Sequence, residues 1–371
     1  MGILEKIKDI EEEMARTQKN KATEYHIGRL KARLAKLRTE LQAPTGSKGD
    51  VHAFEVSAYG DSRVALIGFP SVGKSSLLTA LTGTKSEAAD YEFTTLTCIP
   101  GIIRYNDAEI QLLDLPGIIE GASKGRGRGR QVIAVARSSD LVLIVLDATK
   151  DDSQKEKLER ELEAVGIRLN KRPPNVRITR KKLGGVKFTS QVPLTKMDSK
   201  LVQSILNEYK IFNAEVIIRE DVTVDEFIDV IEGNRKYVTC LYVYNKVDML
   251  SIAEIDEIAR RPFSVPISVN RALNLDGLLE RMWTSIGPCR VYTKKKGNFP
   301  DFTDPIILTS QRGPVTVEQA ACRLHRSIMA EFSRAIVWGR SVKHSPQIVG
   351  KDHVLDDEDV MQIVKKQSTK K

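Results

Sequence analysis

The chain has 371 residues, of which 41% are hydrophobic and 29% charged, a composition typical of soluble globular proteins. Its length suits two to four domains, and its apolar runs, such as Leu141 to Leu146, are far too short for a membrane span. Four scattered cysteines without a C-x-x-C pair argue against a zinc site or a disulfide framework and favour a reducing compartment. The net charge of +9 indicates only an affinity for polyanions.

Residues 3 to 41 are predicted to form two helices separated by "TQKNKAT". In each helix four apolar residues recur at helical spacing and make one stripe: Ile3, Ile7, Ile10 and Met14, then Leu30, Leu34, Leu37 and Leu41. We expect a helical hairpin that packs on the rest of the chain, and a basic hairpin that touches RNA is compatible with it. The segment "QAPTGSKGD" reads as a linker, which places this first domain at residues 1–49.

Residues 51 to 289 alternate strand and helix patterns. The segments "SRVALIGF", "AEIQLLDL", "DLVLIVLDA" and "YVTCLYVYNK" are typical of buried strands, and "GKSSLLTALTG" is typical of a helix. This alternation predicts an α/β domain with a doubly wound, mostly parallel sheet. We place the domain at residues 50–167 and 236–289.

One connection in this domain is too long for a single βαβ unit, which needs about 30 residues. About 90 residues separate Asp147 from Tyr237. We therefore predict a small inserted α+β domain at residues 168–235, with the pattern hairpin, helix, strand, helix. The hairpin would join "NVRITRKK" and "VKFTSQV" across a turn at Leu183, Gly184 and Gly185.

The insertion is also the most basic part of the chain. Residues 171 to 200 contain nine Lys or Arg and a single acid, Asp198. We expect Lys181, Lys182 and Lys187 to lie on one basic face that contacts RNA.

After Gly287 and Pro288 the chain restarts with mixed short strands and one clear helix, Thr316 to Ile328. This pattern predicts a small α+β domain at residues 290–366, followed by a polar tail at 367–371.

The segment "GFPSVGKS", Gly68 to Ser75, fits G-x-x-x-x-G-K-[ST] between a strand and a helix, the context that supports a phosphate-binding loop. Its backbone N–H groups would cradle phosphate, Lys74 would reach the β and γ phosphates, and the Ser75 hydroxyl would hold Mg²⁺. The predicted nucleotide-binding residues here are Gly68, Phe69, Pro70, Ser71, Val72, Gly73, Lys74, Ser75 and Ser76.

Two further segments complete the predicted phosphate side. Asp114 ends the strand after the P-loop helix, where a carboxylate holds Mg²⁺ directly or through water, and Gly117 can offer its N–H to the γ-phosphate. Thr95, with Thr94 as the alternative, can bind Mg²⁺ when the γ-phosphate is present and so act as a switch. The predicted metal ligands are Ser75, Thr95 and Asp114, and the predicted catalytic residues are Lys74, Thr95 and Gly117.

The segment "NKVD", Asn245 to Asp248, follows a later buried strand and favours guanine. The Asp248 carboxylate can accept bonds from N1–H and the exocyclic amino group of guanine, and adenine lacks both donors. The sequence therefore favours GTP or GDP over ATP. The predicted base-site residues are Asn245, Lys246 along the base plane, Asp248, Ser268 as a buttress, and Val269.

Almost the whole chain resembles the developmentally regulated GTP-binding proteins, in the Obg-related group of translation-factor GTPases. The resemblance rests on "MGILEKI", "GFPSVGKSSLL", "YEFTTLTCIPG", "LLDLPGIIEGASKGRGRGRQVI" and "RVYTKKKG". The first residues favour the second of two eukaryotic branches. The resemblance implies an N-terminal helix-turn-helix, an S5D2-like insertion and a C-terminal TGS domain. It also implies a cytoplasmic, ribosome-associated protein that hydrolyses GTP, contacts ribosomal RNA and no membrane, and forms a heterodimer with a dedicated regulatory partner protein.

No side chain is evidently placed to orient the attacking water. Ras-type enzymes use a glutamine after the D-x-x-G loop, whereas Ile118 and Ile119 follow Gly117 here, and the resemblance implies a hydrophobic residue at this place. We therefore expect slow intrinsic turnover, with water positioned by backbone, a switch residue, a partner or K⁺. Related cation-dependent enzymes usually offer an asparagine where this chain has Ser71, which argues against K⁺.

Two other hypotheses remain. The first is an RNA- or ribosome-binding assembly module whose nucleotide site is mainly structural. The second is an ATPase, which Asp248 disfavours.

Overall fold

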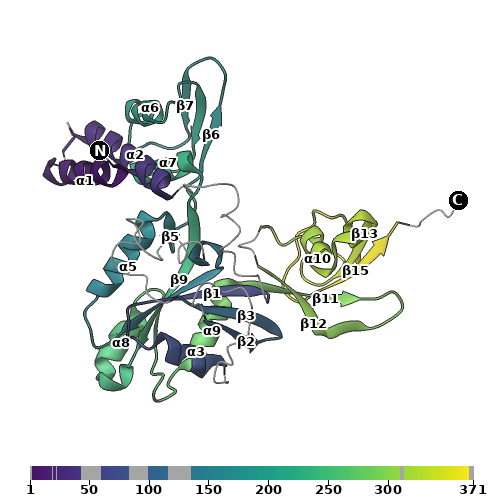
Figure 1. Ribbon diagram of the computed structural model, residues 1–371. Coiled ribbons are helices and arrows are strands. Elements are labelled where there is room, and N and C mark those ends of the chain that lie inside the picture. Colours follow the sequence, from purple (N-terminus) through teal and green to yellow (C-terminus); the bar gives the residue numbers. More distant parts are fainter. Residues whose placement is uncertain are drawn as a thin grey trace. The chain divides into compact units, whose positions relative to one another are not determined.

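The computed structural model describes seven stretches of the chain: residues 2–18, 20–21, 23–42, 60–82, 99–115, 135–309 and 313–366 (Figure 1). The chain divides into two compact units. The first contains residues 1–55, 118–137 and 153–238, and the second contains residues 56–117, 138–152 and 239–371. Among the described residues, none of the helices combines the length and the apolar character that crossing a membrane would need.

A mostly parallel sheet forms the centre of the second unit, as the strand–helix alternation predicts. Its strand order is β10-β9-β4-β1-β3-β2, and only β2 pairs antiparallel, with β3. The strands are β1 (Ser62–Ile67), β2 (Ile99–Tyr105), β3 (Ala108–Asp114), β4 (Leu141–Asp147), β9 (Lys236–Asn245) and β10 (Ser264–Pro266). The associated helices are α3 (Lys74–Thr82), a short 3-10 turn η1 (Val247–Met249), α8 (Ile252–Arg260) and α9 (Leu275–Ile286).

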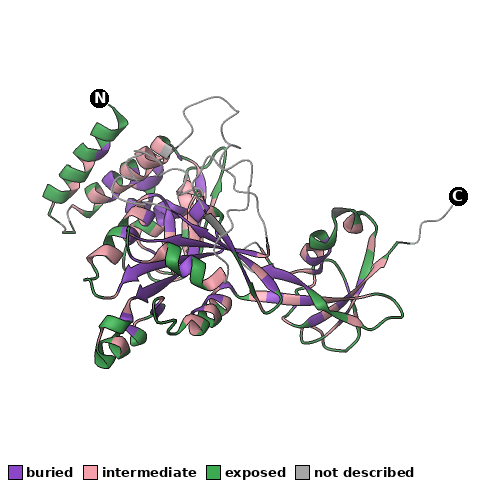
Figure 2. Cartoon of the chain, turned by 60° about the horizontal axis from the view of Figure 1, so that its bottom comes forward, coloured by how far each residue is buried: buried purple, intermediate pink, exposed green. Residues whose placement is uncertain are grey.

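The core strands are apolar because both of their faces are covered. Every residue of β1 and of β4 is buried, as the purple strands in Figure 2 show. On one face, Val64 and Leu66 share a core with Leu77 of α3 and with Leu278 and Met282 of α9. Near-continuous apolar runs of this kind are expected for parallel strands covered on both sides.

The parallel arrangement gathers the ends of four strands at one edge. In the register, Leu66 pairs with Asp114, and Asp147 pairs with Asn245. Because β1, β3, β4 and β9 run in the same direction, the loops that follow them open on the same side of the sheet. Ligands of open α/β sheets bind at this carboxyl edge.

The first unit contains the predicted helical hairpin, α1 (Ile3–Arg16) and α2 (Glu24–Gln42). It also contains α5 (Ser153–Ala164), β5 (Ile167–Leu169), β6 (Val176–Arg180), β7 (Val186–Ser190), α6 (Ser199–Glu208), β8 (Ala214–Ile218) and α7 (Val224–Glu232). Helix α2 approaches α6 closely: a Cβ at Gly28 would lie 2.8 Å from Leu201 Cδ1. Ala32 joins the core formed by α6, α7 and the small sheet.

The hairpin predicted for the insertion is wrong. The small sheet has the order β6-β8-β7, so the two strands that flank Gly184 and Gly185 do not pair with each other. Strand β8 lies between them, antiparallel to β6 and parallel to β7, and its Ala214, Val216 and Ile218 are buried. The central position buries β8, the most apolar of the three strands. The hairpin prediction failed because alternating polar and apolar residues indicate a strand but do not indicate which strand it pairs with.

The C-terminal sheet has the order β12-β11-β15-β13-β14. Its strands are β11 (Pro288–Lys294), β12 (Pro300–Thr309), β13 (Phe332–Trp338), β14 (Gln347–Val349) and β15 (Asp359–Lys365), and its helices are α10 (Val317–Leu324) and α11 (Arg326–Ala330). The single helix predicted from Thr316 to Ile328 is therefore two. His325 adopts an extended backbone and its side chain caps the second helix by accepting from Ser327 N.

Candidate functional site

The loop between β1 and α3 has the backbone conformation of a phosphate-binding turn. Ser71 and Gly73 both adopt positive φ, 64° and 96°. A Cβ at Gly73 would overlap Asn245 Nδ2, so glycine is required there for close approach as well as for its conformation. The loop leads into the first turn of α3, whose free N–H groups favour an anion.

Lys74 and Ser75 stand at the start of α3 and face the end of β3. Lys74 Nζ donates to the carbonyl oxygens of Gly68 and Phe69, at 3.1 and 3.0 Å. Burial lowers the pKa of Lys74, and the nearby Asp114 carboxylate partly opposes that shift. Ser75 Oγ donates to Asp114 Oδ2 at 2.8 Å, so the structure brings two of the predicted metal ligands together.

The chemistry of these two groups fits Mg²⁺. A hydroxyl and a carboxylate are hard oxygen donors, and Mg²⁺ is usually held by one or two protein groups plus water and phosphate oxygens. Within the described ranges, no cluster of three His, Cys, Asp or Glu side chains could hold a metal by itself. The remaining ligands would therefore come from a nucleotide, from water or from residues such as Thr95.

Asn245 links the other loops at this edge. Its Oδ1 accepts from Val269 N at 3.1 Å, and its Nδ2 donates to the Val72 carbonyl at 2.9 Å. Asn245 is buried, so these bonds fix the loop after β10 to the P-loop.

Asp248 is held by the predicted buttress. The Ser268 hydroxyl donates to Asp248 Oδ1 at 2.5 Å and accepts from Arg271 N at 3.3 Å. Ser268 is fully buried, and Val269 follows it. Oδ2 of Asp248 can still accept hydrogen bonds from donors on a base, and Oδ1 can accept one more besides the bond from Ser268.

Asp147 belongs to the site, although no sequence motif predicts it. It ends β4 beside Asn245, and Lys246 Nζ lies 2.7 Å from its Oδ2. Burial would raise the pKa of Asp147, but hydrogen bonds from Lys246 and Thr149 outweigh it and lower the pKa. The ion pair fixes the Lys246 side chain. The sequence signal that could have identified Asp147 is an aspartate at the end of a buried parallel strand.

The other predicted residues fall into two groups. Val72 is buried and Phe69 packs against the central core, while Pro70 and Ser76 are exposed. Thr94, Thr95, Gly117, Ile118 and Ile119 lie outside the described residues.

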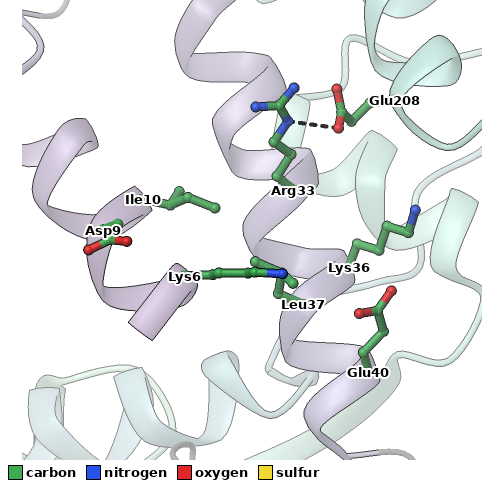
Figure 3. Close-up of a pocket in the computed structure, with 8 residues that line it drawn as sticks. All are labelled: Lys6, Asp9, Ile10, Arg33, Lys36, Leu37, Glu40 and Glu208. Carbon is green, nitrogen blue, oxygen red and sulfur yellow. Dashed lines mark hydrogen bonds and ion pairs between the residues drawn. The ribbon is translucent and has the colours of Figure 1, made fainter. Parts of the chain in front are cut away.

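A separate pocket of about 390 Å³ lies in the first unit, lined by Lys6, Asp9, Ile10, Arg33, Lys36, Leu37, Glu40 and Glu208 (Figure 3). Its charges are mixed, and Arg33 Nε donates to Glu208 Oε1 at 2.8 Å. It has neither a glycine-rich turn nor the first turn of α3, so we do not assign the nucleotide to it.

Family models agree with this geometry. The model described as 50S ribosome-binding GTPase matches residues 63–181, the C-terminal region of the same domain matches 183–287, and the TGS domain matches 289–365. The matches cover the strands and loops that build the carboxyl edge. The fold is therefore a P-loop GTPase domain followed by a TGS domain, and the chain binds GTP and GDP.

The relatives give the family. An uncharacterised GTP-binding protein of Caenorhabditis elegans is 65% identical over 99% of this chain and 100% of its own length. Developmentally-regulated G-protein 2 of Arabidopsis thaliana is 62% identical over 99% of this chain and 92% of its own length. Developmentally-regulated GTP-binding protein 2 of Homo sapiens is 61% identical over 99% of this chain and 100% of its own length. The chain belongs to the developmentally regulated GTP-binding protein family, as the resemblance predicted.

Proposed function

We propose that this GTPase hydrolyses GTP to GDP and phosphate at the carboxyl edge of the central sheet, with slow intrinsic turnover. The 2.8 Å contact between Ser75 and Asp114, beside Lys74, carries the proposal. Magnesium bound there would neutralise charge that develops on the phosphates. Gly117 and Thr95 would sense the γ-phosphate, and Lys74→Ala tests the site, as argued in the Discussion.

The protein's own groups have distinct parts in this proposal. The P-loop backbone would donate N–H groups to phosphate, and Lys74 would exchange the carbonyls of Gly68 and Phe69 for phosphate oxygens. Asp248 would bind the guanine edge while Ser268 and Asn245 hold the base loop. Positioning and electrostatics of this kind account for most of the catalysis of phosphoryl transfer.

The attacking water needs a group that positions it, and a bound K⁺ is one candidate for that role. A monovalent cation between the phosphates would add positive charge, as an arginine finger does. On this hypothesis phosphate release is several-fold faster in potassium than in sodium buffer of equal ionic strength. Ser71 has φ 64°, a conformation that asparagine tolerates, so Ser71→Asn can supply the missing amide oxygen and should widen the difference. Equal rates of the wild type in both buffers would exclude the cation, whatever the variant does.

We further propose that the protein acts in the cytoplasm as a ribosome-associated translation factor, bound to a regulatory partner protein. Its net charge of +9 and the basic insertion support an RNA contact. The matched family model is itself described as ribosome-binding.

Within the insertion, the proposed RNA contact is the exposed face of the sheet formed by β6, β8 and β7. Lys181 Nζ lies 2.6 Å from Glu215 Oε2, and Lys187 is the register neighbour of Glu215 on β7. Lys181, then Lys187 and Arg177, lower the pKa of Glu215. Lys182 is exposed and lies beyond the end of β6. Cations therefore outnumber acids on this face.

Replacing Lys181, Lys182 and Lys187 together with glutamate is expected to weaken ribosome binding. Each lost phosphate contact should reduce the slope of log affinity against log salt by about one. Cosedimentation with ribosomes across a salt series measures both effects. Lys157, Arg260 and Arg281, at exposed positions of α5, α8 and α9, changed together to glutamate give a charge-matched control. Unchanged sedimentation of the insertion variant would reject this face.

A second candidate function remains supported by the same basic face: an RNA-binding assembly module whose nucleotide site mainly stabilises the fold. The two candidates differ in whether GTP turnover occurs, with ribosomes or without them.

A further inference from the structure

Asp147, at the end of β4, is bound on both of its carboxylate oxygens. Oδ1 accepts from the backbone N–H and from the hydroxyl of Thr149, at 3.1 and 2.7 Å. Oδ2 accepts from Lys246 Nζ at 2.7 Å. The Asp147 side chain is only 4% exposed, so little water can replace these donors. The turn after β4 thus fixes the carboxylate, and the carboxylate in turn fixes the lysine.

The backbone of Lys246 is held as well as its ammonium group. Lys246 follows β9 directly and has a φ of 68°, a conformation that is uncommon for a residue with a side chain. Its carbonyl accepts from Met249 N at 3.2 Å within η1, and the preceding Asn245 carbonyl accepts from Ala148 N at 2.9 Å. A backbone hydrogen bond and an ion pair therefore tie the end of β4 to the base loop after β9.

This arrangement orders a side chain that is otherwise among the most mobile. A lysine with no partner moves among many rotamers, and ordering it against a ligand costs much of that freedom. The ion pair with Asp147 supplies the order from within the protein, while 32% of the Lys246 side chain stays exposed. The exposed stem can contact a base without the ammonium group leaving its partner. Preorganisation of this kind strengthens binding mainly by slowing release of the ligand.

We propose that Asp147 is a positioning residue that sets how long a guanine nucleotide stays bound. The carboxylate holds Lys246, and the stem of Lys246 lies along the base plane, so Asp147 acts on the base through the lysine. This role rests on the proposed guanine site, in which Asp248 binds the base edge. It does not depend on hydrolysis, because the transferred phosphoryl group is at the opposite end of the nucleotide from the base.

Release of fluorescent methylanthraniloyl-GDP from the full-length protein, chased with excess unlabelled GDP, measures this role. Asp147→Asn keeps an oxygen that accepts from Thr149 but turns an amide nitrogen toward Lys246, and should release GDP about 10-fold faster. Single-turnover hydrolysis of prebound GTP should stay within about twofold of wild type. Asp152→Asn is the matched control, because Asp152 pairs with Arg261 instead, and it should release GDP like wild type.

A double-mutant cycle separates positioning from a purely structural role. Lys246→Ala should release GDP at least as fast as Asp147→Asn does. Adding Asp147→Asn to Lys246→Ala should change the rate by less than about twofold, because the carboxylate then has no lysine to hold. Effects of the two substitutions that multiply, or wild-type release from Asp147→Asn, would overturn the proposal. Wild-type release from Lys246→Ala would contradict the proposed base site itself, and this role of Asp147 with it.

Discussion

Replacing Lys74 with alanine is expected to lower the rate of GTP hydrolysis about 100- to 1000-fold. Lys74 starts α3, is half-buried, and holds its ammonium group between two P-loop carbonyls, beside Asp114. The transition state of phosphoryl transfer places negative charge in this position, and a preorganised cation stabilises it more than it stabilises the bound substrate. The measurement is phosphate release under single-turnover conditions, with and without ribosomes.

Controls separate a catalytic effect from a folding defect. Lys157→Ala, at an exposed position of α5, removes the same charge from the chain and should leave the rate unchanged. Thermal unfolding should be similar in the Lys74 and Lys157 variants. If the wild type releases phosphate no faster than Lys74→Ala, whether free or bound to ribosomes, the assembly-module hypothesis is the correct one.

The nucleotide loops could be predicted from the sequence because each is a short continuous motif at a strand end. The apolar patterns of β1, β3 and β9 are enough to place Asp114 and Asn245 at one edge of a parallel sheet, as the register shows, and the bond from Ser75 to Asp114 brings the start of α3 to the same edge. Parallel strands have their carboxyl ends on the same side, so strand direction alone was sufficient.

Features made by distant residues could not be predicted in the same way. Asp147 gains its importance from Lys246, which is far away in the chain, and an isolated aspartate carries no motif. The partner of β6 depends on where the apolar strand β8 is buried, which is a property of the whole small domain.

Changing Asp248 to asparagine is expected to reverse the preference between guanosine and xanthosine triphosphates. Ser268 donates to Asp248 Oδ1, and the amide oxygen of asparagine can accept that bond equally well. The amide nitrogen then faces the base. There it cannot accept from the guanine N1–H or amino group, but it can donate to the oxygen at C2 of xanthine. Two lost hydrogen bonds to a charged acceptor should weaken GTP binding by about 100-fold or more.

Competition of GTP, xanthosine triphosphate and ATP against a labelled guanine nucleotide measures the change, with labelled xanthosine nucleotide used for the variant. Asp256→Asn removes the same charge from α8, where Asp256 pairs with Arg260 on the surface, and should keep the wild-type preference. The same experiment tests base recognition independently of catalysis, because it needs no turnover. If Asp248→Asn still prefers GTP as strongly as the wild type does, the guanine edge is read elsewhere. Ser268 and Asp248 would then serve only to hold the loop after β9. Wild-type protein that binds ATP as tightly as GTP would also contradict guanine recognition by Asp248.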